Sequence, residues 1–268
     1  MVAALTPQRI VCLTEETVEW LYLLGQEHRI VGVSGYAVRP ARVRSEKPRV
    51  SAFTSAKIDK ILALEPDLVL GFSDMQADIA SALIRQGVAV TVFNQRSIDQ
   101  IFAMLFQVGA MVGQSEAALA QLKQMRDSLD AMKAQTALWP RRPRVYFEEW
   151  DQPMISAIRW VSELITIAGG DDVFSELATQ SLGKDRIIPD GQEVVRRRPD
   201  IIIGSWCGKK FRPNLVAARE HWQAIPAVQD GALHEIKSAE ILQPGPAALT
   251  DGVQRLHQIC KAWVQAHG

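Results

Sequence analysis

One pattern occurs once in each half of this 268-residue chain and sets the main constraint on its fold. The first copy is LEPDLVLGFS, which spans Leu64–Ser73, and the second is RRPDIIIGSW, which spans Arg197–Trp206. Each copy has a Pro-Asp pair, then a short apolar run, then glycine and a polar loop. A second pair of segments, Arg9–Glu16 and Arg144–Glu149, also matches, and each leads into an expected helix that ends in glycine. Two matches in the same order indicate two copies of one α/β unit.

A stretch with a helical pattern lies between the two copies. It begins at Ser97, which fits a capping box with Gln100, and a second segment begins at Ser115. Apolar residues recur at helical spacing through both segments. A helix of ~20 residues spans roughly 30 Å, which is enough to run from one domain to another. We therefore expect residues 1–96 to form an N-terminal α/β lobe, residues 97–139 to form linking helices, and residues 140–268 to form a C-terminal α/β lobe.

Strand-like apolar segments alternate with helical segments in both lobes. The expected strands are 9–13, 30–33, 68–71 and 88–93 in the first lobe, and 145–147, 201–203 and 233–236 in the second. Segments rich in Val, Ile and Leu that are separated by helices are typical of a parallel sheet covered on both faces. The predicted fold class is α/β: two Rossmann-like lobes with parallel sheets, joined by a long rigid interdomain helix. Ligands of such sheets bind outside the carboxyl ends of the strands, so we expect a ligand cleft between the lobes.

Composition excludes several classes of function. The formal net charge is zero, which offers no general attraction for nucleic acid, and no apolar run is long enough to cross a bilayer. The three cysteines have neither metal-binding spacing nor a disulfide pattern. The first residues lack the charged start and apolar core of a signal peptide. We therefore expect a cytoplasmic protein, or a periplasmic one if a signal peptide has been removed and the start replaced.

The loops at the strand ends hold most of the aromatic and charged residues that a ligand site needs. Trp and Tyr offer rigid faces to a flat ligand, and Arg and Lys beside them can bind carboxylate or phosphate groups or lie over the rings. A tryptophan that fills a lobe interface is the ordinary alternative for any single position. For the group as a whole we predict a ligand site formed by Glu15, Glu16, Tyr36, Arg39, Glu149, Trp150, Arg159, Trp160, Trp206, Lys209, Lys210 and Arg212.

The sequence offers little support for an enzyme. None of the five histidines falls on an expected strand-end loop, so the usual general base and the commonest zinc ligand are missing there. Cys207 is followed by Gly208 and Lys209, which could lower its pKa, but it lacks a histidine partner. The pairs Glu15-Glu16 and Glu148-Glu149 would each point one side chain to the site if extended. We predict no catalytic residue, cofactor or metal, and keep an enzyme that uses Cys207 or Glu149 as a minor alternative.

The arrangement resembles a known family. Two α/β lobes joined by a long helix, with KILALEPDLVLG in the first and VVRRRPDIIIG in the second, are similar to the helix-hinged substrate-binding proteins of ABC transporters (class III, cluster A). The stretch VSAFTSAKIDKILALEPDLVL and the later AGG most resemble the vitamin B12 (cobalamin)-binding branch. The resemblance implies an interlobe cleft, binding without catalysis, a stiff hinge, and cobalamin or a ferric siderophore as the ligand. We also expect a monomer.

The resemblance further implies a partner. Family members dock on arginines of an ABC permease through one acidic residue on each lobe. Alignment on the Pro-Asp pairs puts Asp59 at the first docking position, and Gln192, with Glu193 beside it, at the second.

Two departures from the family suggest an alternative function. The start lacks a signal peptide, and the second docking position is Gln192 rather than an acid. The expected cleft is also more charged than a corrin requires. The alternative is a cytoplasmic binding or sensor protein, no longer coupled to a transporter, that holds a small anionic metabolite through Arg39, Arg159, Lys209 and Arg212.

Overall fold

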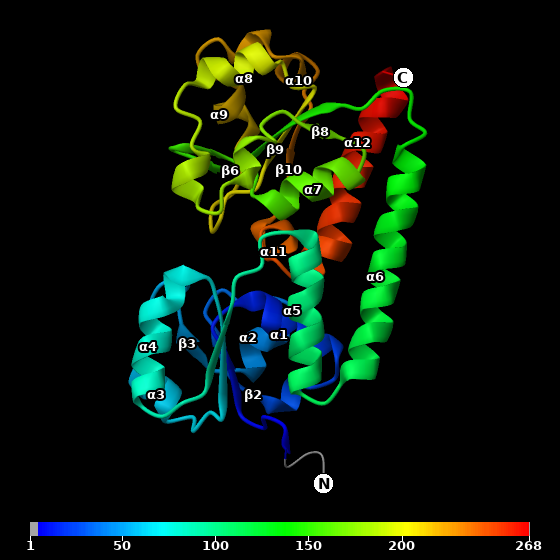
Figure 1. The fold of residues 1–268 in the computed structure, drawn as a ribbon. Coiled ribbons are helices and arrows are strands. Elements are labelled where there is room, and N and C mark those ends of the chain that lie inside the picture. Colours follow the sequence, from blue (N-terminus) through cyan, green and yellow to red (C-terminus); the bar gives the residue numbers. More distant parts are fainter. Residues whose placement is uncertain (1–4, 268) are drawn as a thin grey trace. The chain divides into compact units, whose positions relative to one another are not determined.

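The computed structural model describes residues 5–267 and divides into two compact units (Figure 1). The N-terminal unit holds the described residues up to Gln95 together with Asp99–Gln124. The C-terminal unit holds Arg96–Ile98 and the described residues from Met125 onward. The helices expected at 97–139 are therefore shared between the units rather than forming a part of their own.

The N-terminal unit is a parallel sheet with helices on both faces. Its five strands run in the order β3-β2-β1-β4-β5, and the pairings between them are all parallel. The strands are β1 Ile10–Cys12, β2 Ile30–Ser34, β3 Arg49–Ser51, β4 Leu68–Phe72 and β5 Val90–Phe93. The helices are α1 Glu15–Leu23, α2 Val43–Glu46, α3 Ile58–Leu62, α4 Ala77–Arg85 and most of α5 Ile98–Met111.

The C-terminal unit has a mixed sheet. Its order is β10-β9-β6-β7, with β8 paired to β6, and only the β6–β7 pairing is antiparallel. The strands are β6 Arg144–Asp151, β7 Met154–Ser156, β8 Asp171–Asp172, β9 Ile201–Gly204 and β10 Leu233–Glu235. The helices are α7 Arg159–Ile167, α8 Gly191–Arg197, α9 Pro213–Ala217, α10 Pro226–Gln229, α11 Ser238–Ile241 and α12 Val253–His267, which follows a π-helical turn at Ala248–Gly252.

The helix α6, Ser115–Thr136, is the long helix that the sequence predicted, and it continues from one unit into the other. In the N-terminal unit it follows α5 closely, since a Cβ on Gly109 would lie 2.5 Å from the Cβ of Ala118. In the C-terminal unit Leu129 is buried, and the hydroxyl of Thr136 donates to the carbonyl of Ile167 at 3.0 Å. Both ends of α6 are thus packed against the unit that they belong to.

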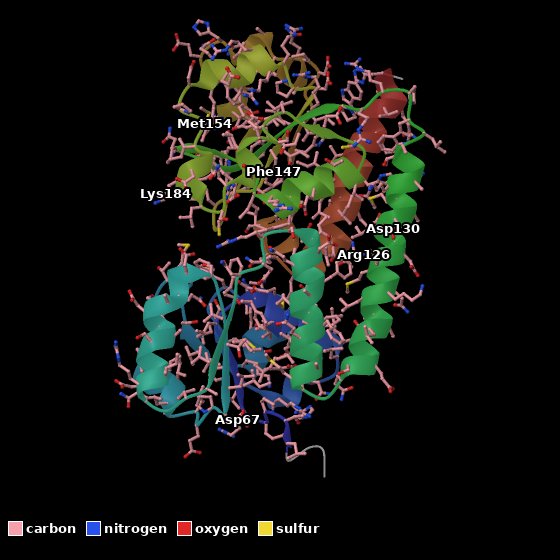
Figure 2. The ribbon with its side chains drawn as sticks, in the orientation of Figure 1. Asp67, Arg126, Asp130, Phe147, Met154 and Lys184 are labelled. Carbon is pink, nitrogen blue, oxygen red and sulfur yellow. The ribbon has the colours of Figure 1, made fainter. Side chains whose placement is uncertain are left out.

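The repeated Pro-Asp pattern has the same structural role in both units. The carboxylate of Asp67 accepts hydrogen bonds from the backbone N–H of Gln8 at 2.6 Å and of Arg9 at 2.9 Å, just before β1. In the C-terminal unit the carboxylate of Asp200 accepts from the backbone N–H of Arg144 at 2.9 Å, at the start of β6. Figure 2 shows Asp67 at the end of the N-terminal unit where β1 begins. Each aspartate therefore fixes the first strand of its unit beside the strand that follows the motif.

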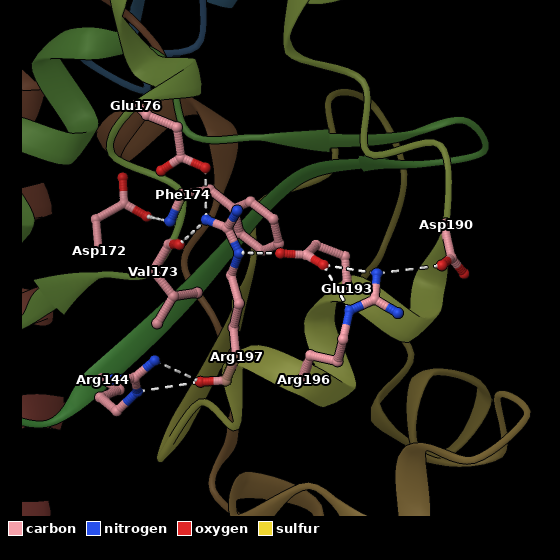
Figure 3. Close-up of polar contacts among 9 residues, drawn as sticks. All are labelled: Arg144, Asp172, Val173, Phe174, Glu176, Asp190, Glu193, Arg196 and Arg197. Carbon is pink, nitrogen blue, oxygen red and sulfur yellow. Dashed lines mark hydrogen bonds and ion pairs between the residues drawn. The ribbon is translucent and has the colours of Figure 1, made fainter.

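The residues around each Pro-Asp pair also correspond. The guanidinium of Arg9 donates to the carbonyl of Leu64, and that of Arg144 donates to the carbonyl of Arg197 (Figure 3). The residue before each proline is left-handed, with φ 46° at Glu65 and φ 44° at Arg198. A left-handed residue ends the preceding helix, and the proline prevents its continuation. The repeated sequence pattern therefore corresponds to a repeated structure: a helix ends, an aspartate caps the first strand of the unit, and a second strand begins. This confirms the duplicated α/β unit.

The central strands explain why their sequences are apolar throughout rather than alternating. Ile10, Val11 and Cys12 of β1 have no exposed surface, and neither do Ile201, Ile202 and Ile203 of β9. Helices cover both faces of each sheet, so every position on β1 and β9 is buried. The last residue of β9 is glycine because a Cβ on Gly204 would lie 1.8 Å from the ring of Phe211.

Two details of the C-terminal unit differ from the prediction. The strand expected at 145–147 extends to Asp151 and turns into the antiparallel strand β7, so Glu148–Asp151 lie on a strand rather than in a loop. The short strands β3 and β8 were not predicted, because two or three residues carry too little pattern.

Candidate functional site

The carboxyl ends of β6 and β9 bring together most of the candidate residues of the C-terminal unit. Glu148 of β6 is paired in register with Gly204 of β9. The end of β6, Glu149–Asp151, therefore lies beside the loop after β9, which runs through residues 205–212. This edge is where parallel α/β sheets bind ligands, so it is the first candidate site.

The ammonium of Lys209 is the centre of a small cluster at this edge. Its Nζ lies 2.7 and 2.6 Å from the two carboxylate oxygens of Asp151. The same atom lies 5.1 Å from the ring centroid of Trp150 and 4.9 Å from that of Trp206. These distances are within the range of a cation–π interaction, so the lysine is held by one carboxylate and two indoles. The structure thus brings together three predicted site residues, and adds Asp151, which was not predicted.

A buried carboxylate fixes the position of Trp206. Glu148 has no exposed surface, and its Oε1 accepts from the indole Nε1 of Trp206 at 3.0 Å. The guanidinium of Arg219 contacts both carboxylate oxygens, at 2.5 and 2.9 Å, and the hydroxyl of Tyr146 donates to Oε2 at 2.8 Å. A buried charge is tolerated when it is paired and its remaining lone pairs accept hydrogen bonds, as here. We call Glu148, Arg219, Tyr146 and Trp206 the Glu148 network.

The neighbouring Glu149 binds a different arginine. Its carboxylate is 2.7 Å from Nη1 and 3.2 Å from Nη2 of Arg186, whose side chain is 1% exposed. Arg186 also donates to the carbonyl of Ser156 on β7. The two adjacent glutamates of β6 therefore serve two separate structural ion pairs. Glu149 is half-buried, and its carboxylate helps to hold the segment that contains Arg186 against β7.

The prediction for Trp160 is corrected, whereas Trp206 lies at the candidate edge but is almost fully buried. Trp160 is 2% exposed and its indole Nε1 donates to the carbonyl of Ile241 at 3.0 Å, so it is a core residue of α7 and not a ligand-binding surface. Trp206 is 4% exposed, packed edge-to-face on Phe211 with 5.0 Å between centroids, and covered by Lys209. Trp150 is the half-buried tryptophan at this edge, with its Nε1 bonded to the carbonyl of Gln152.

The remaining predicted cationic residues of this unit differ in their surroundings. Arg159 forms an ion pair with Glu163 one turn along α7, at 2.9 Å. Lys210 and Arg212 are exposed in the loop after β9. Cys207 is exposed in the same loop and is not in a disulfide.

In the N-terminal unit the acidic pair at the start of α1 is buried. Glu15 is 8% exposed and Glu16 is 1% exposed. Burial raises the pKa of Glu15 to about 6. Burial, and then the charge of Glu15, raise the pKa of Glu16 to about 8, although the hydroxyl of Thr14 donates to its Oε1 at 2.7 Å. The prediction that at most one of the two faces the site assumed an extended segment, whereas both residues lie on α1 and both are buried.

The other two candidates of the N-terminal unit follow β2. Tyr36 is 52% exposed, and Arg39 forms an ion pair with Glu19 of α1 at 2.8 Å. Arg39 thus has a carboxylate partner within its own unit. Among the described residues, no group of three or more His, Cys, Asp or Glu side chains is arranged to hold a metal ion.

The predicted docking residues lie on short helices at comparable places in the two units. Asp59 is exposed on α3. On α8 the carboxylate of Glu193 is 2.6 Å from Arg196 and 2.7 Å from Arg197 (Figure 3), and these hydrogen bonds lower its pKa. Gln192 donates its backbone N–H to Asp190 at 2.8 Å. Glu193 is therefore already neutralised by two arginines of its own helix.

Some important residues were not predicted. Asp151, Arg186 and Arg219 carry the ion pairs of the candidate edge, and each is distant from its partner in sequence, as with the 71 residues between Glu148 and Arg219. The only local signal was that the loops after β6 and β9 hold acids and bases together. That signal identifies the edge of the sheet, but it does not show which acid pairs with which base.

The chain folds into two α/β units, and comparison with known proteins identifies the family. A family described as periplasmic binding protein matches residues 10–240. A cobalamin-binding protein of Halobacterium salinarum is 25% identical over 249 residues, which cover 90% of this chain and 66% of that protein. This chain therefore spans slightly less than two thirds of that relative's length.

Solved structures share the fold. The periplasmic vitamin B12 binding protein BtuF of Vibrio cholerae superposes with a TM-score of 0.76 at 21% identity, covering 96% of this chain and 98% of that one. The periplasmic heme-binding protein RhuT from Roseiflexus gives a TM-score of 0.79 at 20% identity, covering 94% and 99%. The chain belongs to the periplasmic binding protein family. No helix in residues 5–267 has the length and apolar character needed to cross a membrane.

Proposed function

We propose that this chain is the ligand-binding component of an ABC importer and that its cargo is cobalamin. The observation that carries the proposal is the family match over residues 10–240, together with relatives whose names specify cobalamin. The fold, with ligand-competent strand ends in both units, agrees with it. Heme and ferric siderophores are the other cargoes to test, since proteins of the same fold carry heme in their names.

The side chains support a binding protein better than an enzyme. The family and fold are those of substrate-binding proteins. The buried carboxylate of Glu148 pairs with Arg219, and the half-buried carboxylate of Glu149 pairs with Arg186, which leaves neither as a ready acid or base. We therefore propose binding without catalysis.

The charges at the strand ends argue against the small anionic metabolite. Three of the four cations assigned to that ligand have carboxylate partners: Arg39 with Glu19, Arg159 with Glu163, and Lys209 with Asp151. An anion would have to displace these carboxylates. A large flat ligand needs only apolar and aromatic surface with a few polar contacts, and Trp150 can supply such a surface at the edge of the C-terminal unit.

The partner and the location follow from the family and remain part of the proposal. Because the family is typically periplasmic, we propose that the chain works outside the cytoplasm and presents its ligand to an ABC permease. Asp59 is the exposed docking acid that we propose on the N-terminal unit. On the C-terminal unit we propose Asp190, the N-cap residue of α8, as the docking acid. Its side chain is 54% exposed and pairs with Arg196 at 3.4 Å, whereas Glu193 pairs with both Arg196 and Arg197 at 2.6 and 2.7 Å.

The direct test is a fluorescence titration of the purified protein with cyanocobalamin, hemin and a ferric siderophore. We expect cyanocobalamin to quench the tryptophan fluorescence saturably at micromolar concentration or below. Saturation by hemin or the siderophore alone would keep the binding function and change the cargo. If none of the three ligands binds but a small dicarboxylate binds saturably, the result would favour the alternative function, a binding protein for a small anionic metabolite.

A further inference from the structure

The cluster around Lys209 has the composition of a cation-binding site. A carboxylate, Asp151, and two indole rings, Trp150 and Trp206, surround one ammonium group. A negative charge beside the negative faces of aromatic rings is the arrangement that recognises alkylammonium and quaternary ammonium groups. The side chain of Asp151 is only 14% exposed, so its charge acts in a partly desolvated place.

The walls of this site are fixed independently of the lysine. Trp206 is held by Glu148, which is itself held by Arg219 and Tyr146. The indole of Trp150 is held by the carbonyl of Gln152. None of these contacts involves Lys209, so the two rings are preorganised without it, and the backbone of Asp151 is placed by its pairing with Met154 of β7.

Lys209, whose ammonium occupies this site, lies in contrast in an exposed part of the loop after β9. Residues Cys207–Lys210 are all exposed, and Gly208 adopts φ 70°, a conformation that glycine enters at little cost. The side chain of Lys209 remains 42% exposed even while its ammonium is bound. A rigid site and a solvent-facing occupant indicate that the occupant can leave.

We propose that Asp151, Trp150 and Trp206 form a binding site for an organic ammonium group, and that Lys209 fills this site as a built-in competitor. A ligand that carries a primary or quaternary alkylammonium group displaces Lys209 and takes its three contacts. The exposed segment Cys207–Lys210 then becomes free to rearrange, while Trp206 stays in place. This site does not depend on the identity of the cargo, so its test can fail while the proposed cobalamin function stands, and the reverse.

The experiment removes the competitor and offers a free ammonium in its place. The ¹⁵N-labelled full chain and its Lys209→Ala variant are titrated with n-butylammonium chloride at constant ionic strength, and the indole N–H resonances of Trp150 and Trp206 are followed. We expect saturable shifts of both resonances in Lys209→Ala. We expect an affinity at least about tenfold weaker in the unsubstituted chain, because a tethered ammonium competes at a millimolar or higher effective concentration.

Four controls distinguish a competing Lys209 from a lysine with a purely structural role. Lys184→Ala removes another exposed lysine of the same unit (Figure 2) and should bind n-butylammonium as weakly as the unsubstituted chain. Lys209→Ala combined with Asp151→Asn should lose most of the gained affinity, and n-butanol should shift neither indole. Lys209→Ser is titrated in parallel, so that a loop collapse specific to alanine does not decide the outcome.

The proposal is overturned by either of two results. One is the absence of saturable shifts in both Lys209→Ala and Lys209→Ser while their thermal melts match that of the unsubstituted chain. The other is an equal response to n-butylammonium and n-butanol, which would show an apolar contact rather than a cation site.

Discussion

Replacing Glu148 by alanine should destabilise the C-terminal unit strongly, because four hydrogen bonds converge on this fully buried carboxylate. The substitution leaves the guanidinium of Arg219 without its partner, and the hydroxyl of Tyr146 and the indole N–H of Trp206 without an acceptor. Breaking a buried ion pair by removing one side costs roughly 3–5 kcal/mol. The side chain of Arg219 is 22% exposed and can partly rehydrate, so we expect a loss of about 3 kcal/mol, at the lower end of that range.

The assay is urea denaturation followed by tryptophan fluorescence and circular dichroism. With a slope of about 2 kcal/mol per M, the predicted loss lowers the midpoint of the C-terminal unit by roughly 1.5 M urea. The two units need not unfold in one transition, so the transition of the C-terminal unit is assigned by the emission of Trp206 and Trp222, which lie in its core.

The matched control is a surface pair of the same chemistry. Arg255 is 60% exposed and pairs with Glu240 at 3.2 Å, so Arg255→Ala should cost less than about 1 kcal/mol. The double variant Glu148→Ala with Arg219→Ala should lose less than the sum of the single variants, because removing the arginine relieves an unpaired buried charge. A loss below about 1 kcal/mol for Glu148→Ala would refute the argument that this network fixes the strand-end edge.

Three further predictions follow from single positions. Because the pKa of Glu16 is raised to about 8 in the folded state, the folded chain binds more protons than the unfolded chain between about pH 4.5 and 8. Stability should therefore fall as pH rises through that window, by at most about 1.4 kcal/mol per pH unit from this group, and Glu16→Gln should flatten the dependence in melts across pH. Asp200→Ala removes the acceptor for the backbone N–H of Arg144 and should cost about 2 kcal/mol by urea denaturation, with an unchanged midpoint contradicting the capping role. Gly204→Ala places a Cβ 1.8 Å from the ring of Phe211 and should cost at least ~1–3 kcal/mol in the same assay, so wild-type stability would contradict the packing described for β9.

The repeated motif predicted the fold well because its residues carry local structural roles. Proline ends a helix, and the aspartate that follows caps a strand, as Asp67 and Asp200 do. The apolar runs after them are buried on both faces, and that is visible in sequence as an absence of alternation. The long helix α6 was also predictable, since twenty or so residues with helical spacing and no proline leave few alternatives.

The grouping of Trp150, Trp206 and Lys209 at one sheet edge was predictable, but the contacts of each residue were not. Nothing in the local sequence distinguishes Trp160, which bonds to Ile241 in the core, from Trp150, which is half-buried at the edge. The cations were recognised, but their carboxylate partners lie elsewhere in the chain, as Asp151 does for Lys209. The surroundings of a residue depend on which other segments pack against it, and residue spacing along one strand does not show which segments those are.

The extent of β6 illustrates the same limit. The charged run from Glu148 to Asp151 looks like a loop, because an ordinary strand would end where the apolar residues end. It remains a strand because Arg219 and Arg186 neutralise the two glutamates and β7 pairs with its far end. Tertiary ion pairs have thus overridden the local preference.

The central claim is that this member of the periplasmic binding protein family carries cobalamin, and isothermal titration with cyanocobalamin tests it most directly. The account predicts one saturable site per chain at micromolar affinity or tighter, weakened by Trp150→Ala at the candidate edge and unchanged by Trp160→Phe in the core. The absence of heat and of binding with cyanocobalamin, in a protein whose melting shows that it is folded, would contradict the claim.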